Sequence, residues 1–450
     1  MEGINTVLTS ITGVLFGPYM LAVYFGTGLY LTIRTRGIQF RKMGLAFRSM
    51  FRTKTSGEGE IRPFWALASA LSSCIGVGNI AGVAAAIATG GPGAIFWMWV
   101  AAILGMATKY TEIVLAMKFR EQDETGQWHG GCMYIWKNGM KSHPYLAKVL
   151  GGIFAFAAVF VGLVSCNMLQ TNTVVSSLSR YHVPGWTVGI LFAVLTGVII
   201  LGGIKRLGRV TSVLTPVMGL IYVAGCIVIL VLHGNRIIPA FGLIFSAAFN
   251  GQAAVGGFSG ASIAFAVRMG VSRGIMSNEA GIGSSAMIHS TTSAKNPCEQ
   301  GLFGILEVFF DTIVVCTATA LVIITTGVWH SGATSAALSA EAFRLGLPGN
   351  WGHIVVIVAT VLFSYSTLLG WSWYAETGVS FLLGSRVVKP FRVIWCVFAF
   401  LGAIINITVV WNLADTVNGI MALPNLLSLW VFAGAAMKLT KENFSKGDKQ

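Results

Sequence analysis

Charged side chains are scarce in this sequence of 450 residues. Asp, Glu, Lys and Arg make up 10% of the chain, whereas 55% of its residues are hydrophobic. Soluble domains carry about 25% charged residues, so this composition excludes a soluble protein. It predicts an all-α polytopic protein embedded in a lipid bilayer. The net charge of +14 is spread over short patches between apolar runs, which is typical of loops at an anionic leaflet and does not indicate a nucleic-acid partner.

Motifs for catalysis and metal binding are also absent. None of the seven cysteines has C-x-x-C spacing, so we expect neither a structural zinc nor a disulfide framework. The sequence contains no H-E-x-x-H, no G-x-x-x-x-G-K and no G-x-S-x-G, and Gly76-Val77-Gly78 lacks the third glycine of a dinucleotide fingerprint. We therefore expect no enzyme, no cofactor, no ATP-driven pump and no obligate protein partner. Its first residues do not resemble a signal peptide.

A sliding apolar window predicts eleven transmembrane helices without a domain linker, so residues 1–450 form a single domain. The predicted spans are 12–33, 64–90, 93–119, 150–178, 186–203, 209–233, 250–271, 301–328, 353–383, 390–410 and 418–439. With the N-terminus outside and the C-terminus inside, nearly all of the 30 Lys and Arg residues fall in inner loops, and Arg180, Arg236 and Arg344 are the outer exceptions. Segment 235–249 is too short to span and predicts a helix on the outer surface, and segment 53–60 is polar enough to predict mobility.

Residues 72–83 interrupt the second predicted span with small and polar residues at mid-depth. Gly76, Gly78 and Asn79 weaken a helix where lipid offers no substitute hydrogen-bond partners, so we expect the helix to break there. Half-helix ends at membrane depth bind small ions and polar ligands. The alternative is a glycine-rich packing face for a neighbouring helix, but Asn79 gives such a face no benefit.

A second glycine-rich interruption follows at residues 254–262, five spans later and in the opposite direction across the bilayer. Such a pair predicts a 5+5 inverted repeat with halves 64–233 and 250–439, the helix at 12–33 being additional. Glycine clusters also occur in tightly packed spans, so this pairing needs independent support.

The ends of the broken helix complement an amino-acid zwitterion. The carboxylate would lie against the N–H groups near Val77 and Gly78, helped by the amide of Asn79. The ammonium would face carbonyls near Cys74 and around 257–259.

Four further side chains are candidates for this site. Gln170 offers amide donors to a carboxylate, although it also suits bonding between helices. Ser366 and Thr367, with carbonyls of the broken helix, make an all-oxygen site for a hard cation such as Na⁺, although such hydroxyls more often bond their own helix. Trp371 would close the pocket or simply pack.

Placing an ionisable side chain in a transmembrane helix is energetically unfavourable, so each such residue calls for a structural or functional explanation. Lys109 and Glu112 are three residues apart on one helix, so we expect them to neutralise each other. Glu307, Asp311 and Glu376 are candidate proton or cation relays, but helix-end positions and buried hydrogen bonds explain them as well.

Two runs closely resemble the alanine or glycine:cation symporter family, within the amino acid-polyamine-organocation superfamily. The first is residues 76–83 (GVGNIAGV), continuing through 90–99 (GGPGAIFWMW) to 108–112 (TKYTE), and the second is residues 277–286 (SNEAGIGSSA). The resemblance extends along essentially the whole chain. It implies the leucine-transporter type of fold with two discontinuous helices, a substrate contact by Asn79 and Gln170, and a sodium site between backbone at 74–78 and Ser366 with Thr367.

Residues and resemblance together predict a sodium-coupled symporter that imports alanine or glycine across the cytoplasmic membrane of a prokaryote. The predicted substrate-binding residues are Cys74, Ile75, Val77, Gly78, Asn79, Gln170, Gly257, Phe258, Ser259 and Trp371. The predicted sodium ligands lie near Gly76, Val77, Ser366 and Thr367. A proton-coupled symporter is the nearest alternative, a channel lacks the ring of charges that it needs, and a sensor lacks a soluble signalling domain.

Overall fold

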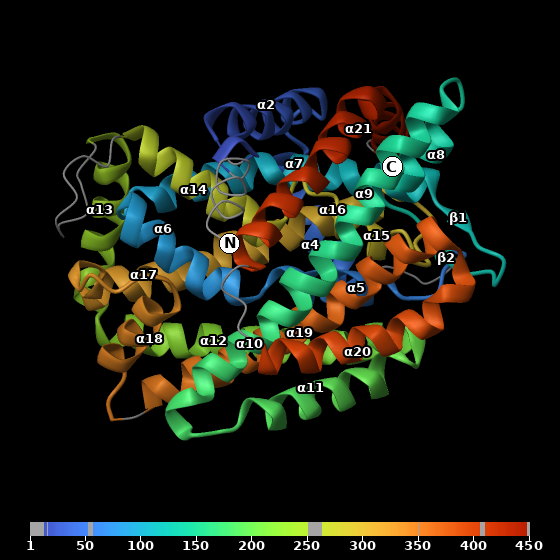
Figure 1. Ribbon diagram of the computed structural model, residues 1–450. Helices are drawn as coiled ribbons and strands as arrows, with labels where there is room; N and C mark the ends of the chain where they lie inside the picture. Colours follow the sequence, from blue (N-terminus) through green and yellow to red (C-terminus); the bar gives the residue numbers. More distant parts are fainter. Residues whose placement is uncertain are drawn as a thin grey trace.

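The computed structural model describes residues 13–15, 17–52, 57–250, 263–349, 351–405 and 410–447. Almost all of this part of the chain is helical, and β1 (Glu121–Gln122) pairs with β2 (Trp128–His129) in one short antiparallel hairpin. The long helices run roughly from left to right in Figure 1, with α13, α17 and α18 at one end and the β1–β2 hairpin and α8 at the other. These two ends are named here the α18 end and the hairpin end.

Eight helices in the described part are long and apolar enough to cross a membrane, and one bent pair adds a ninth span. The continuous helices are α2 (Pro18–Arg34), α7 (Ala94–Phe119), α12 (Gly203–Leu232), α19 (Trp351–Leu383), α20 (Val388–Ile404) and α21 (Val410–Gly447). Two others contain a π-helical turn: α9 (Pro144–Leu163), η2 (Val164–Met168) and α10 (Leu169–Leu178), then α16 (Pro297–Val308), η5 (Phe309–Cys316) and α17 (Thr317–Thr326). The bent pair is α5 (Pro63–Cys74) with η1 (Gly78–Gly82) and α6 (Val83–Gly90). The predicted all-α polytopic architecture is confirmed.

Two predicted spans are incomplete by these criteria. Helix α11 (Gly185–Ile200) is apolar but has only 16 residues. Helix α14 (Ile263–Asn278) is the described part of the predicted span 250–271. Residues 251–262 lie outside the described residues, and with them the predicted second break and Gly257, Phe258 and Ser259. The count of eleven spans and the inverted repeat therefore stay predictions.

Shorter elements cap the bundle. They are α3 (Ile38–Arg41), α4 (Met43–Arg52), α8 (Cys132–Gly139), α13 (Ile237–Asn250), α15 (Ala286–His289), α18 (Ser335–Gly346) and the 3-10 turns η3 (Ser179–Tyr181), η4 (Gly234–Arg236), η6 (Val328–His330) and η7 (Ser385–Val387). Helix α13 confirms that segment 235–249 is helical, whereas α18 was not predicted. The location of α13 on an outer membrane surface stays a prediction.

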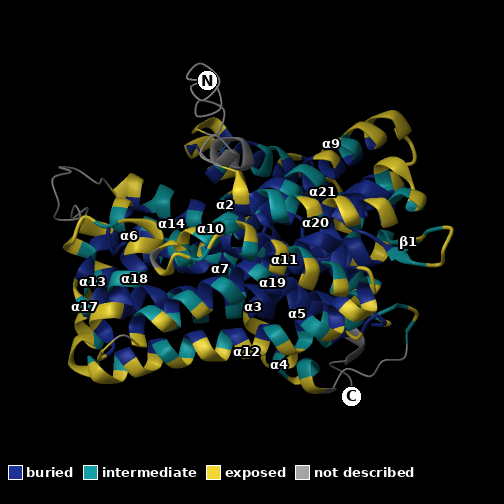
Figure 2. Cartoon of the chain, turned by 60° about the horizontal axis from the view of Figure 1, so that its bottom comes forward, coloured by how far each residue is buried: buried dark blue, intermediate teal, exposed yellow. Residues whose placement is uncertain are grey.

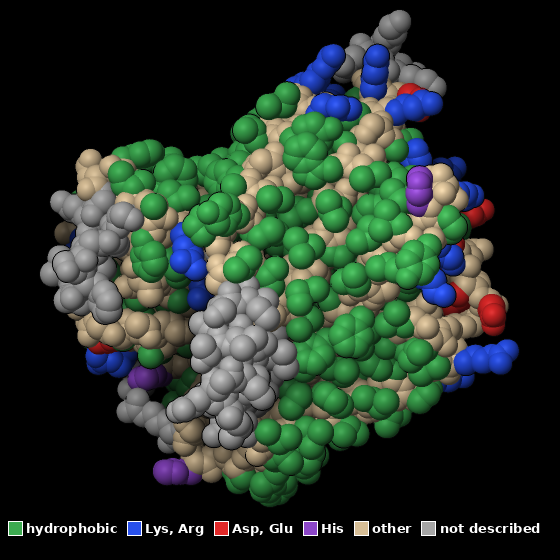
Figure 3. Space-filling model, turned by 45° about the horizontal axis from the view of Figure 1, so that its top comes forward, with side chains coloured by type: hydrophobic (Ala, Val, Ile, Leu, Met, Phe, Trp, Pro, Cys, Tyr) green, Lys and Arg blue, Asp and Glu red, His purple; other side chains and the backbone are tan. Residues whose placement is uncertain are grey.

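The outward faces of the long helices are apolar. On α12, Leu220 is 70% exposed and Val231 is 73% exposed. Buried residues fill the middle of the molecule in Figure 2, and hydrophobic side chains cover the broad middle of the face in Figure 3. Large exposed apolar surfaces are typical of proteins that face lipid.

The hairpin end is closed by contacts between loops. The backbone N–H of Glu60 donates to the carbonyl of Thr291 at 2.9 Å. The guanidinium of Arg120 donates to the carbonyl of Thr292 at 2.8 Å. Gly57, Glu58 and Glu60 thus make backbone hydrogen bonds to distant residues, and the predicted mobility of segment 53–60 stays a prediction.

A fully buried ion pair joins α7 to α16. The ammonium of Lys109 lies 3.1 Å from a carboxylate oxygen of Glu307, and both side chains are fully buried. Glu112 instead accepts hydrogen bonds from the N–H of Gly281 at 2.9 Å and from the amide of Asn425 at 2.6 Å. The predicted pairing of Lys109 with Glu112 was therefore wrong, because α16 offers Lys109 a carboxylate from across the interface.

Replacing Glu307 by alanine should destabilise the fold. The substitution leaves the Lys109 ammonium buried without its carboxylate, which costs about 3–5 kcal/mol. We expect a clearly lower thermal unfolding temperature in detergent for the Glu307→Ala variant. Glu299→Ala is the matched control, because Glu299 lies on the same helix but is exposed. Equal unfolding temperatures for the two variants would contradict this reading of the ion pair.

Candidate functional site

The membrane-spanning pair α5–α6 is interrupted near its middle. Helix α5 ends at Cys74, Ile75 adopts extended backbone angles (φ −70°, ψ 90°), and the chain resumes as a π-helical turn at Gly78. The helices on either side of the break differ in direction by 53°. The predicted break in the second span is confirmed. It brings the carbonyl end of one half-helix and the N–H end of the other to one level of the bundle.

Burial changes abruptly across the break. Residues 66–76 are buried without exception, whereas Val77 is half-buried and Gly78 is exposed. On α19, residues 366–380 are all buried, whereas Tyr365 is half-buried. The half of the bundle toward the hairpin end is therefore tightly packed, and the backbone at Gly78 is accessible.

Asn79 holds the break in shape. Its side chain is fully buried, and its carbonyl oxygen accepts a hydrogen bond of 2.9 Å from the N–H of Gly76. Its amide nitrogen donates to the carboxylate of Asp311 at 2.7 Å. Both halves of the amide thus bind protein groups in this conformation, and the predicted contact of Asn79 with substrate stays a prediction.

Asp311 lies in the π-helical turn η5 and faces the break. Besides the amide of Asn79, the hydroxyls of Ser277 and Thr312 donate to its carboxylate, each at 2.8 Å. All three donors are neutral. Sequence reasoning left the role of Asp311 open and did not identify Ser277 or Thr312 as its partners. Ser277 opens the second family-like run, which was the one available signal.

The other two carboxylates left open have cationic partners. Glu307 binds Lys109, and Glu376 makes a two-fold contact with the guanidinium of Arg392 at 2.6 and 2.7 Å. Within the described ranges, Asp311 is thus the member of these three carboxylates that has no ion pair.

The predicted sodium ligands lie together where α19 crosses the end of α5. The hydroxyl of Ser366 donates to the carbonyl of Ser72 at 3.1 Å. The hydroxyl oxygen of Thr367 is buried without a hydrogen-bond partner, and a Cβ on Gly76 would lie 2.7 Å from it. An unpartnered hydroxyl beside the backbone of a broken helix fits the all-oxygen surroundings that a hard cation takes.

The close approach of α19 to α5 depends on a glycine. A Cβ on Gly370 would lie within 2.9 Å of the hydroxyl of Ser72 and even nearer to that of Ser73. No side chain fits between the two helices there. This contact fixes the hydroxyl pair on α19 against the last turn of α5.

Gln170 has a side chain that is only partly satisfied. It follows the π-helical turn η2, it is half-buried, and its amide nitrogen lies 3.5 Å from the carbonyl of Ser165. Its amide oxygen is buried without a partner. A buried acceptor without a donor is costly, which favours a ligand contact over a purely structural role.

Trp371 and Cys74 face the interior. The indole N–H of Trp371 donates to the carboxylate of Glu279 at 3.0 Å, and its ring meets that of Tyr374 edge-on. The thiol of Cys74 lies 3.1 Å from the carboxylate of Glu307. Sequence reasoning did not foresee these carboxylates as partners.

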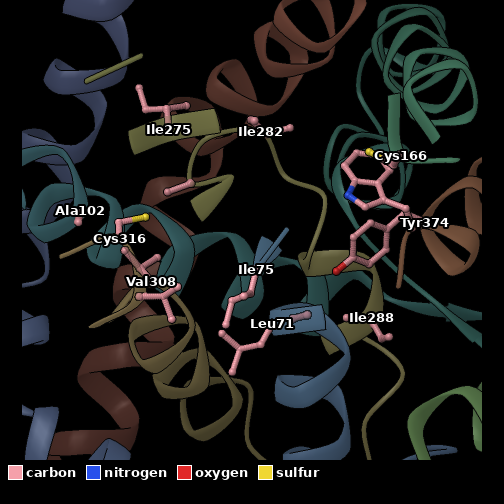
Figure 4. Close-up of a cluster of buried hydrophobic side chains, with 14 of the residues drawn as sticks. Leu71, Ile75, Ala102, Cys166, Ile275, Ile282, Ile288, Val308, Cys316 and Tyr374 are labelled. Carbon is pink, nitrogen blue, oxygen red and sulfur yellow. The ribbon is translucent and has the colours of Figure 1, made fainter. Parts of the chain in front are cut away.

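The interrupted helix crosses a buried apolar cluster. In Figure 4, Leu71 and Ile75 lie between Val308 and Cys316 on one side and Tyr374 on the other. All five side chains belong to one buried cluster. Ile75 therefore sits where α5, α16 and α19 meet.

Comparisons with known proteins agree with this geometry. A model of the sodium:alanine symporter family matches residues 1–450. The sodium/alanine symporter AgcS of Methanococcus maripaludis is 42% identical over 97% of this chain and 96% of its own length. The amino-acid carrier protein AlsT of Bacillus subtilis is 35% identical, with 100% of this chain and 94% of its own length covered.

A solved structure is similar in fold. MhsT, crystallised in complex with L-phenylalanine, superposes with a TM-score of 0.58 at 13% identity, covering 84% of this chain and 90% of MhsT. The predicted leucine-transporter type of fold is thereby confirmed. The relatives also confirm a multi-pass membrane transporter, not an enzyme, with sodium-coupled amino-acid transport as its general activity. The chain belongs to the sodium:alanine symporter family.

Proposed function

We propose that this symporter imports small neutral amino acids, alanine and glycine, together with Na⁺ by alternating access. One observation carries the proposal most strongly: the unpartnered hydroxyl of Thr367 lies beside Gly76 at the edge of an interrupted helix whose Gly78 is accessible. The name of the relative AgcS supports alanine as substrate.

The substrate zwitterion would lie along the break. Its carboxylate would accept hydrogen bonds from backbone N–H groups at Val77 and Gly78, where the second half-helix begins. Its ammonium would face the carbonyl end of α5 near Cys74 and the predicted second break at 257–259. Gln170 would contact the ligand from the facing wall, Asn79 would support the carboxylate, and Trp371 would close the pocket.

The coupling ion would lie beside the substrate. The hydroxyls of Ser366 and Thr367 and carbonyls at Gly76 and Val77 would supply its oxygens. Backbone of the same short segment would then hold both ligands, so each would favour the conformation that binds the other.

The closed hairpin end supports a direction for this conformation. With the N-terminus outside and the C-terminus inside, the hairpin end is cytoplasmic and the break opens toward the exterior. Import then requires the loop contacts made by Glu60 and Arg120 to separate. The halves 64–233 and 250–439, with the first helix additional, would move relative to each other as inverted repeats.

Uptake into proteoliposomes tests the function itself. We expect an inward Na⁺ gradient to concentrate radiolabelled alanine inside the vesicles, unlabelled glycine to compete, and replacement of Na⁺ by choline at fixed pH to abolish accumulation. Accumulation in choline driven by an inward proton gradient would instead establish proton coupling. Equilibration without concentration would indicate a channel.

Substitution of Gly78 tests the substrate position. A Cβ at Gly78 meets no atom nearer than 3.9 Å, so Gly78→Ala should fold normally while its methyl group enters the proposed ligand space. We expect the half-saturating alanine concentration to rise roughly tenfold, equivalent to about 1.4 kcal/mol of binding free energy. Gly82→Ala is the matched control, since a Cβ there meets no atom within 4 Å. Equal kinetics for both variants would remove Gly78 from the site.

Substitution of Thr367 tests the ion position. Thr367→Val keeps the shape of the side chain and removes the unpartnered hydroxyl, so we expect the half-saturating Na⁺ concentration to rise roughly tenfold. Thr377→Val is the control, because the hydroxyl of Thr377 already donates to the carbonyl of Trp373 at 2.8 Å. An unaltered Na⁺ dependence in Thr367→Val would refute this ligand.

A further inference from the structure

A basic hollow opens where α2, α3 and α21 meet, far from the break. It has a volume of about 310 Å³ and lies at the end of α2 that follows the last membrane-embedded turn. Five cationic side chains line it: Arg34, Arg36, Arg41, Lys42 and Lys441. Nothing in the proposed transport cycle uses them.

The hollow is electrostatically one-sided. No Asp or Glu among the described residues lines it. The positive charges of Arg34, Arg36, Arg41 and Lys441 around this space repel one another, so the local potential favours an anion. Arg34 and Arg41 are exposed and keep their guanidinium groups accessible to a ligand. Guanidinium groups bind the oxygens of carboxylate and phosphate groups in pairs, and phosphate is the one of these that every phospholipid head group carries.

Neighbouring aromatic side chains indicate the level of the hollow in the membrane. Tyr30, one turn before Arg34, stacks on Trp430 of α21 with ring centroids 4.3 Å apart. The guanidinium of Arg34 donates to the hydroxyl of Tyr30 at 3.2 Å. Tyr and Trp are enriched at the boundary between hydrocarbon and head groups. The cations beyond them therefore lie at head-group level.

The surroundings of the hollow also suit a lipid. Its wall includes the apolar side chains Met437 and Phe444. Phe40, beside Arg41 in the sequence, is 66% exposed, and the segment around it is basic. Exposed aromatic side chains among cations are typical of helices that lie in the membrane interface. In Figure 3, Lys and Arg side chains gather mainly along the margins of the hydrophobic face.

We propose that this hollow binds the phosphate head group of an anionic phospholipid from the adjacent leaflet. The cations of α2, α3 and α21 contact the phosphate, and the apolar wall contacts the glycerol and the first part of the acyl chains. The lipid thereby bridges α2 to α21, which are far apart in sequence.

Native mass spectrometry of the full chain with added lipid tests this site. The probes are phosphatidylglycerol, phosphatidylcholine and glycerol phosphate, which carries the phosphate without acyl chains. We expect the wild type to retain phosphatidylglycerol at least about tenfold better than phosphatidylcholine. The combined variant Arg34→Gln, Arg41→Gln and Lys441→Gln should lose most of this preference.

A control variant with the same change in net charge distinguishes binding in the hollow from nonspecific electrostatic attraction between anionic lipid and the protein. Arg48→Gln, Lys295→Gln and Lys438→Gln alter three exposed cations that do not line the hollow, and we expect this variant to keep the preference. Unfolding temperatures of both variants verify that they fold. Equal retention by the two variants would overturn the proposal. Competition by glycerol phosphate as strong as by the lipid would overturn a phospholipid as the occupant.

Discussion

Backbone groups bared inside a membrane have no water to bind, so a helix broken at mid-depth needs protein partners at every exposed position. Here the partners are few and specific. The side chain of Asn79 accepts a hydrogen bond from the N–H of Gly76 and donates one to Asp311, which lies far away in the sequence. The hydroxyl of Ser366 donates to the carbonyl of Ser72. The packing of the surrounding helices brings these groups together at the break.

Irregular helices position several of the side chains near the break. The interrupted span contains a π-helical turn, and further π-helical turns carry Asp311 in one neighbouring span and Asn167 beside Gln170 in another. A π-helical turn shifts the register of side chains along a helix, which is why such turns are frequent at functional sites. The thiol of Cys74 ties the broken end to the buried pair of Glu307 and Lys109. Any movement of the break must therefore disturb packing on several helices.

Local sequence predicted the break correctly, because glycine residues weaken a helix at the position where they occur. The role of Ser366 and Thr367 as sodium ligands stays a prediction. Contacts between residues far apart in the sequence could not be predicted in this way. Lys109 and Glu112 share a helix face by spacing, yet Lys109 pairs with Glu307, whose approach depends on how α7 and α16 pack. In the same way, nothing in the sequence near Asn79 reveals that Asp311 binds its amide, and α18 lies between two predicted spans where no helix was predicted.

The buried carboxylate of Asp311, which has no cationic partner among the described residues, would favour a cation at the proposed ion site. Moving Na⁺ from water into a protein interior is unfavourable unless negative charge or dipoles replace its hydration. Asp311 binds the amide of Asn79, which also accepts from the N–H of Gly76, so its negative charge lies near the break and would stabilise the proposed ion. Three neutral donors stabilise the carboxylate itself. The hydroxyl of Thr367, which has no hydrogen-bond partner, would gain one if the proposed ion binds there. In the proposed site, ion binding and the shape of the break would therefore depend on the same hydrogen-bonded groups.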